Sequence, residues 1–374
     1  MIEPAGIYVH LPYCAVRCGY CTFFVETDDS SRAAYLGSLE AEAAGVAESA
    51  QGAAFDSIYL GGGTPSRIPA ADIARLLRAM RARFAVAQGA EVTLEANPED
   101  VEAHTLGAWQ EAGVTRVSLG VQSFADAELA AVGRAHDARA ALRALAILSD
   151  ARVSLNADLI LGLPEQTPET FLASLRRLLD HPVDHVSVYL LEDSREVAED
   201  RRGRPERYLG DDAQAALWLS AGRLLAERGF DHYEVSNWAL PGRQARHNRK
   251  YWDRVETVGL GASAHELWGG LRRANVSSLP RYVSELASGR RPTVFERRID
   301  DEESEREAII LGMRKAEGVP SEAVSDYIAR QADARLAGDW RAWTEAGLVA
   351  ERNGRSALTE LGFLVSNEIL CRFV

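Results

Sequence analysis

The 374-residue sequence contains no run of eighteen consecutive apolar residues, so it predicts no transmembrane helix. Its first residues, Met1-Ile2-Glu3-Pro4, lack a basic segment followed by an apolar one, which is the pattern of a secretory signal. An excess of positive charge is also missing, because the net charge is −13, and this argues against a general nucleic-acid binder. We therefore expect a cytoplasmic protein with no nucleic-acid partner and at most a peripheral association with membranes.

Cysteine is scarce, and its distribution excludes a disulfide framework. Of the four cysteines, Cys14, Cys18 and Cys21 lie within eight residues of one another, and Cys371 lies near the C-terminus. Disulfides usually join distant segments of small secreted domains, and this pattern does neither. Clustered thiols in a cytoplasmic chain indicate metal ligands or redox groups, whereas Cys371 is a weak candidate for any role.

The first two thirds of the chain alternates short apolar runs with longer amphipathic stretches. Six such β/α units predict an α/β fold with a parallel sheet and helices on its outer face. Six units are too few for a closed eight-unit barrel, so we expect an incomplete (β/α)6 TIM-like barrel whose chemistry lies at the carboxyl ends of the strands. The predicted strands are 6–10, 57–60, 91–96, 116–120, 155–160 and 185–189, and the predicted helices are 32–50, 70–83, 101–112, 125–132, 138–149 and 168–179.

Beyond the six units, the composition changes along the chain. Residues 194–210 are rich in Arg, Glu, Asp and Gly and predict a flexible loop, and residues 240–270 predict a site-forming loop. Near the end, two helical patterns precede an alternating stretch around Asn353-Gly354, which indicates a β-hairpin and a small α+β, winged-helix-like module. We expect three parts: the barrel over 1–240, a connecting segment over 241–291 and the module over 292–374.

The string Cys14-Ala-Val-Arg-Cys18-Gly-Tyr-Cys21 follows the first predicted strand directly. Thiolates are strong ligands for iron, and a four-iron, four-sulfur cluster normally takes four protein ligands. Three cysteines would hold three irons and leave one iron open to a small chelating ligand. The alternatives are inert buried thiols or a zinc site, which would have to recruit a distant group such as His10.

This C-x3-C-x2-C spacing, with Tyr20 before the last cysteine, resembles the signature of the radical S-adenosylmethionine (SAM) family. The resemblance extends through nearly the whole chain to the coproporphyrinogen III oxidase-like branch, and within it to the HemW-type heme chaperones. It rests on Tyr8-Val-His-Leu-Pro-Tyr-Cys14, Gly61-Gly-Gly-Thr-Pro65, Glu95-Ala-Asn-Pro98, Ser118-Leu-Gly-Val-Gln-Ser-Phe124, Asp158-Leu-Ile-Leu-Gly-Leu-Pro164 and His247-Asn-Arg-Lys-Tyr-Trp252.

The resemblance implies that SAM chelates the open iron through its amino and carboxylate groups. In the Gly61–Pro65 turn, glycines allow backbone amides to approach a ligand closely, although the same string also suits an ordinary tight turn. In the oxidases, positions matching Gln122, Arg134 and Asp158 contact a second SAM; a plain alternative is a structural ion pair between Arg134 and Asp158. The residues expected to contact the first SAM are Tyr8, Tyr20, Gly62, Gly63, Thr64 and Glu95.

The string His247-Asn248-Arg249-Lys250-Tyr251-Trp252 is a candidate heme site. Neutral imidazole is a good axial ligand for heme iron, and aromatic rings offer flat faces to a porphyrin. The resemblance implies heme binding by His247, Asn248, Tyr251 and Trp252. The alternative is a loop histidine with aromatic rings that fill the floor of the fold, and His265 is a weaker candidate.

Two features separate the chain from the oxidases of this branch. Phe23 stands where those enzymes carry a fourth cysteine, and the chain enters its first strand without the extension that they have. Thr22 departs in the other direction, because the HemW-type group commonly has Asp there. The expectation is a chaperone that receives electrons from a donor and transfers heme to an acceptor such as a respiratory cytochrome. The alternative is an enzyme, either an oxygen-independent coproporphyrinogen III oxidase or a radical SAM methyltransferase.

Overall fold

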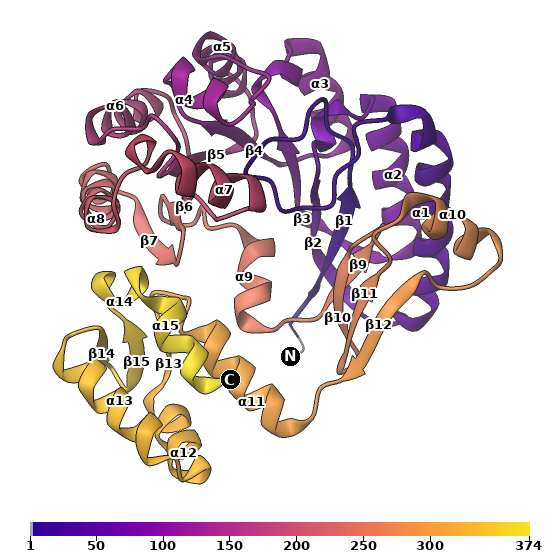
Figure 1. The fold of residues 1–374 in the computed structure, drawn as a ribbon. Helices are drawn as coiled ribbons and strands as arrows, with labels where there is room; N and C mark the ends of the chain where they lie inside the picture. Colours follow the sequence, from indigo (N-terminus) through magenta and orange to yellow (C-terminus); the bar gives the residue numbers. More distant parts are fainter. Residues whose placement is uncertain (1–2) are drawn as a thin grey trace.

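The computed structural model describes residues 3–374, and its centre is a curved sheet of twelve strands (Figure 1). Six of them pair in sequence order and are all parallel. Because parallel strands run in one direction, their carboxyl ends meet along one edge of the sheet. These strands are β1 (Ala5–Leu11), β2 (Ala54–Gly62), β3 (Ala85–Ala96), β4 (Arg116–Gln122), β5 (Ser154–Leu161) and β6 (His185–Leu190).

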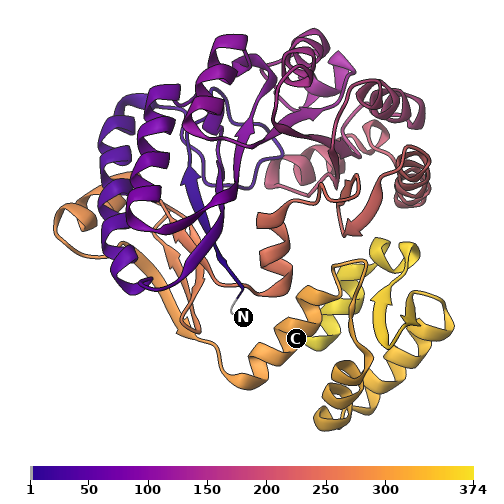
Figure 2. The ribbon, with the colours of Figure 1, turned by 180° about the vertical axis from the view of Figure 1, so that it is seen from behind.

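Helices cover the outer, convex face of this sheet (Figures 1 and 2). Strand residues alternate between the two faces, so Ile7 and Val9 are fully buried against the helices while Tyr8 and His10 point inward. Thr167 begins one helix with a capping box. The predicted incomplete (β/α)6 barrel is confirmed. Its helices are α1 (Arg32–Ser49), α2 (Ala70–Arg83), α3 (Ala103–Ala112), α4 (Asp126–Ala131), α5 (Ala138–Ser149) and α6 (Pro168–Leu179).

Shorter strands extend the sheet beyond both β1 and β6. On the β6 side, β8 and β7 add antiparallel strands; on the other side, β9 pairs parallel to β1, and β10, β11 and β12 follow. The helix α9 (Arg246–Asp253) lies on the concave side of the sheet (Figure 1). The added strands are β7 (Asp231–Glu234), β8 (Asn237–Ala239), β9 (Thr257–Leu260), β10 (His265–Trp268), β11 (Leu271–Asn275) and β12 (Thr293–Arg298).

Two predicted loops prove to be ordered elements. Within 194–210 the chain forms α7 (Arg195–Gly203), because the Ser194 hydroxyl caps the helix at the Val197 amide, 3.0 Å away, and Val197 is buried. Within 240–270 the chain forms α9, β9 and β10; β9 pairs with β1, and α9 contacts β1 and β2. The other two α-helices between β6 and β12 are α8 (Asp211–Glu227) and α10 (Leu279–Ala287).

The C-terminal module combines helices with a separate three-stranded sheet (Figure 2). Asn353 and Gly354 have φ of 53° and 71°, so they form the predicted hairpin turn between β14 and β15. The α+β module is confirmed, while the boundaries at 240 and 291 stay predictions. Across residues 3–374, no helix is long and apolar enough to cross a membrane. The module consists of α11 (Asp301–Gly312), β13 (Val319–Pro320), α12 (Ser321–Gln331), α13 (Ala334–Glu345), β14 (Val349–Arg352), β15 (Arg355–Leu358), α14 (Glu360–Leu364) and α15 (Ser366–Leu370).

Candidate functional site

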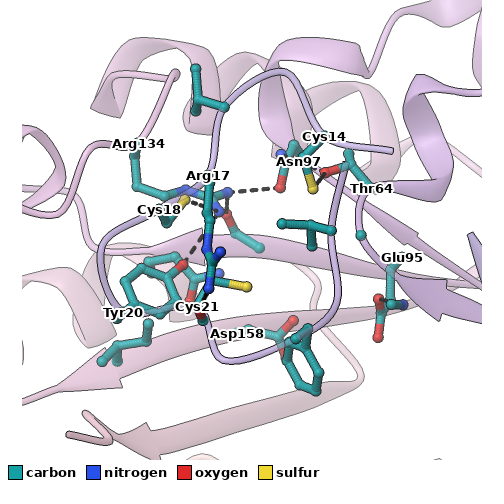
Figure 3. Close-up of a pocket in the computed structure, with 18 of the residues that line it drawn as sticks. Cys14, Arg17, Cys18, Tyr20, Cys21, Thr64, Glu95, Asn97, Arg134 and Asp158 are labelled. Atoms are coloured by element: carbon teal, nitrogen blue, oxygen red, sulfur yellow. Dashed lines mark hydrogen bonds between the residues drawn. The ribbon is translucent and has the colours of Figure 1, made fainter. Parts of the chain in front are cut away.

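The three clustered cysteines lie on the loop after β1, at the carboxyl edge of the sheet. Backbone hydrogen bonds hold the loop: Cys14 N donates to Glu26 O at 2.9 Å, and Gly19 N donates to Val132 O at 3.1 Å. Cys14, Cys18 and Cys21 are unpaired and half-buried, and all three line one cavity of about 380 Å³ (Figure 3). The three cysteines that lie close together in the sequence therefore line a single pocket.

Hydrogen bonds to sulfur connect this loop to the turn after β2 and to the loop between α4 and α5. Thr64 Oγ1 donates to Cys14 Sγ at 3.2 Å, and Arg134 Nη1 contacts Cys18 Sγ at 3.7 Å (Figure 3). Asn97 links these donors, because its Nδ2 donates to Thr64 Oγ1 at 3.3 Å and its Oδ1 accepts from Arg134 at 2.7 Å. Donors to sulfur stabilise the thiolate and tune the potential of an iron–sulfur cluster.

The Cys14 and Cys21 thiols favour their protonated forms in the metal-free protein. Burial raises the pKa of the Cys14 thiol to about 11, although the Thr64 hydrogen bond opposes the shift. Burial also raises the pKa of Cys21. Metal binding must therefore release these protons, as is usual for thiolate sites. The donor set fits an iron–sulfur cluster, since three soft ligands line the pocket together with donors to two of the sulfurs.

A zinc site would need a fourth ligand such as His10, but other groups already bond both ring nitrogens of His10. Its Nδ1 hydrogen bonds with the Tyr8 hydroxyl at 2.9 Å, and its Nε2 with the Phe24 carbonyl at 2.9 Å. Within residues 3–374, no group of three or more His, Cys, Asp or Glu side chains is arranged to hold a single metal ion.

The pocket brings together eight of the nine residues predicted to contact SAM. The exception is Tyr8, which is not part of the lining; its ring stacks on Tyr59, with 6.1 Å between the ring centroids. A direct contact between Tyr8 and SAM therefore stays a prediction. The eight that line the cavity are Tyr20, Gly62, Gly63, Thr64, Glu95, Gln122, Arg134 and Asp158.

The Gly-rich turn 61–65 packs closely against the start of the cysteine loop, and this close packing explains why the turn is rich in glycine. Gly62 has φ of 108°, a conformation that side chains strongly disfavour. A Cβ atom on Gly63 would lie 2.5 Å from the carbonyl carbon of Pro12, which is backbone. Gln122 also lines the pocket with a positive φ of 64°, and strained backbone of this kind gathers at binding sites.

Two half-buried carboxylates lie on the inner wall of the pocket. Glu95 accepts hydrogen bonds from the Tyr59 hydroxyl at 2.7 Å and from the Gly62 amide at 3.0 Å. Burial, with a smaller contribution from Asp158, raises the pKa of Glu95 to about 7. Asp158 accepts from Ser118 at 3.1 Å, and its pKa is also raised by burial.

The alternative of an ion pair between Arg134 and Asp158 is wrong. Arg134 Nη2 instead donates to Asn97 Oδ1 and, at 3.0 Å, to the Gly120 carbonyl, whereas Asp158 is bonded to Ser118 and Asn156. Both side chains nevertheless line the same cavity, with Arg134 against the cysteine loop.

The candidate heme residues lie apart from this pocket, on α9. The His247 side chain is fully buried; its Nδ1 hydrogen bonds with Ser57 Oγ at 2.9 Å and its Nε2 with the Tyr251 hydroxyl at 3.0 Å. Burial lowers the pKa of His247 to about 3, so the ring is neutral. Tyr251 is 43% exposed, and Asn248 and Trp252 are half-buried. The weaker candidates also lie elsewhere: His265 begins β10, and Cys371 is exposed in the C-terminal module.

Comparison with known proteins gives two family matches. The radical SAM superfamily model matches residues 8–178, and the HemN C-terminal domain model matches residues 299–365. The heme chaperone HemW of Mycobacterium tuberculosis is 33% identical and covers 98% of this chain and 94% of the relative. The chain belongs to the HemW family of radical SAM proteins. The HemW protein of Escherichia coli is 36% identical over 71% of this chain and 70% of its own length.

A solved structure outside the HemW group shares the fold. The coproporphyrinogen III oxidase HemN of Escherichia coli has a TM-score of 0.85 and 22% identity, covering 100% of this chain and 90% of that chain. Membership of the radical SAM family implies a four-iron, four-sulfur cluster and SAM.

Two pocket residues of this HemW-family chain escaped the sequence analysis. Asn97 connects Thr64 to Arg134, and Tyr59 donates to Glu95. Asn97 could have been predicted from the sequence, because it lies in the string Glu95-Ala-Asn-Pro98. Tyr59 lies within the predicted strand 57–60, and no local sequence signal distinguishes it from a packing residue.

Proposed function

We propose that this chain is a heme chaperone that carries a four-iron, four-sulfur cluster and SAM, binds heme and transfers it to an acceptor protein. The observation that carries this proposal is the match along nearly the full length of relatives named heme chaperone HemW. An electron donor and a heme-accepting protein, such as a respiratory cytochrome, are the implied partners. The expected cytoplasmic location stays a prediction.

In this proposal Cys14, Cys18 and Cys21 would hold the cluster, and the iron without a protein ligand would be available to SAM within the same cavity. When bound, the cluster supplies an electron that cleaves SAM. The protein orients SAM through the Gly62–Thr64 turn and Glu95, and the half-buried loop limits the access of water. Tyr20 also lines the cavity and is expected to contact the same SAM. Gln122, Arg134 and Asp158 line it as well and are available to a second SAM or to another ligand.

The affinity for SAM is expected to rise with pH. The ionised carboxylate of Glu95 accepts hydrogen bonds from SAM, whereas the protonated form accepts poorly. Because the pKa of Glu95 is about 7, affinity should fall about tenfold for each pH unit below about pH 7 and level off above about pH 8. The titratable groups that act on this carboxyl are Tyr59, Tyr8, Tyr189, Tyr251 and Asp158.

Equilibrium titration of the reconstituted protein with SAM across this pH range checks the prediction. Glu95→Gln removes the titrating group but keeps an acceptor oxygen, so any dependence that remains in the variant belongs to SAM itself. An identical profile in the wild type and the variant would show that Glu95 does not control binding.

Hemin is expected to bind with a saturable shift of its Soret band. We propose His247, Asn248, Tyr251 and Trp252 as the binding residues, which requires at least one ring nitrogen of His247 to leave its hydrogen-bond partner. His247→Ala should weaken hemin binding at least tenfold, which corresponds to about 1.4 kcal/mol. His104→Ala is the matched control, because His104 is an exposed histidine on α3 and is not a candidate heme ligand.

Two outcomes of this titration would change the proposal. No saturable shift in the wild type would eliminate the chaperone function. Equal affinity in His247→Ala would move the heme ligand elsewhere; the rim of the pocket, where Val16, Phe23 and Leu190 are 44%, 65% and 43% exposed, is then the next apolar surface to test.

The alternative function is radical chemistry on a tetrapyrrole or methyl transfer. The exposed Phe23 occupies the place of the oxidases' fourth cysteine at the rim of the pocket. Anaerobic incubation with coproporphyrinogen III, dithionite and SAM should therefore yield no protoporphyrinogen. Release of 5′-deoxyadenosine decides nothing here, because SAM cleavage is compatible with both functions.

A further inference from the structure

Tyr59 lies between the two groups of candidate site residues. The cavity occupies the carboxyl ends of the strands, whereas His247 lies against Gly6 and Ser57, nearer the strand starts. On β2 between them, the Tyr59 ring stacks on the His247 ring, with 5.2 Å between the ring centroids and 30° between the planes. Its hydroxyl donates to Glu95 Oε1 at 2.7 Å.

We propose that Tyr59 is a positioning residue that couples α9 to the SAM pocket through Glu95. This inference rests on the proposed SAM site. Because the Tyr59 hydroxyl donates to Oε1 and the Gly62 amide donates to Oε2, both oxygens of the half-buried Glu95 carboxylate are held in place. A buried carboxylate that loses one of its donors rotates or takes up a proton, and either change alters the acceptor offered to SAM.

The other end of the connection is equally constrained. His247 has hydrogen-bond partners at both ring nitrogens, and its backbone amide donates to Glu91 Oε1 at 3.0 Å. A Cβ atom on Gly6 would lie 3.0 Å from His247 Cε1, so the ring fills its site against β1. When a ligand draws the imidazole away, Tyr59 loses its stacking partner. By linkage, ligand binding at α9 and SAM binding in the pocket then change each other's affinity by the same factor.

The test is a double-mutant cycle on SAM affinity, measured by equilibrium titration of the reconstituted protein. Tyr59→Phe keeps the ring and removes the donor, and it should weaken SAM binding about tenfold. His247→Ala should weaken it about threefold. The double variant should bind no more weakly than Tyr59→Phe, because His247 acts through the Tyr59 hydroxyl. Unchanged affinity in Tyr59→Phe, or losses that multiply in the double variant, overturns the proposal.

Tyr282→Phe is the matched control. Tyr282 also donates its hydroxyl to a buried carboxylate, Glu42 Oε2, at 2.6 Å, but neither residue lines the pocket. Tyr282→Phe should lower the unfolding temperature without changing SAM affinity. If it weakens SAM binding as Tyr59→Phe does, the effect is general destabilisation and the coupling is refuted. If the wild type binds no SAM, the proposed function fails and the coupling falls with it.

Discussion

Replacement of Cys14, Cys18 and Cys21 together by serine is expected to abolish the iron–sulfur chromophore. All three thiols line one cavity, and serine hydroxyls are hard, weakly acidic groups that do not replace thiolates on iron. After anaerobic reconstitution, the triple variant should hold less than about a tenth of the wild-type iron and sulfide and show no brown absorbance. Iron and sulfide analysis beside the visible spectrum makes the measurement.

Cys371→Ser provides the control for this experiment. Cys371 is exposed in the C-terminal module, and its thiol donates to the Glu368 carbonyl at 3.2 Å. Its loss should leave the iron content and spectrum unchanged. A triple variant that stays brown, or a Cys371→Ser variant that loses its colour, would assign the cluster to other ligands.

Gly63→Ala is expected to damage both stability and SAM binding. The new Cβ atom would lie 2.5 Å from Pro12 C and 2.6 Å from Pro12 O, where no flexible side chain can move aside. The turn must separate from the cysteine loop, and the hydrogen bond from Gly63 N to Leu11 O at 2.9 Å is lost. A cost of about 3 kcal/mol follows, with a loss of SAM affinity of at least tenfold.

Thermal unfolding and SAM titration measure these two effects. Gly107→Ala is the matched control, because a Cβ atom on this glycine of α3 meets nothing within 4 Å. In a helix interior alanine is favoured over glycine, so this variant should be as stable as the wild type or slightly more stable. Wild-type SAM affinity in Gly63→Ala would show that the turn does not form part of the SAM site.

The order of the parallel strands was predictable because local pattern and tertiary structure agree there. Inward and outward residues alternate along β1, and the amphipathic helices between strands leave a right-handed crossover as the usual connection. Since parallel strands end at one edge, the loop of Cys14 and the turn of Gly62 had to meet. The pocket was therefore predictable as a place, and eight of its predicted residues line it.

The position of α9 was not predictable from local sequence. His247-Asn-Arg-Lys-Tyr-Trp252 is polar and aromatic, and it read as a loop. Its burial depends on partners about 150 to 190 residues away, namely Ser57 and Glu91, and on the ion pair between Lys250 and Asp56 at 2.8 Å. Such long-range pairs carry no periodic signal, so the separation of His247 from the cysteines emerged only in three dimensions.

The most direct test of the account is the electron paramagnetic resonance spectrum of the dithionite-reduced, reconstituted protein before and after addition of SAM. One iron of the proposed cluster has no protein ligand, so chelation by SAM should change the spectrum of the reduced cluster in the wild type. A spectrum that stays the same at saturating SAM would contradict an iron open to SAM and, with it, the proposed site.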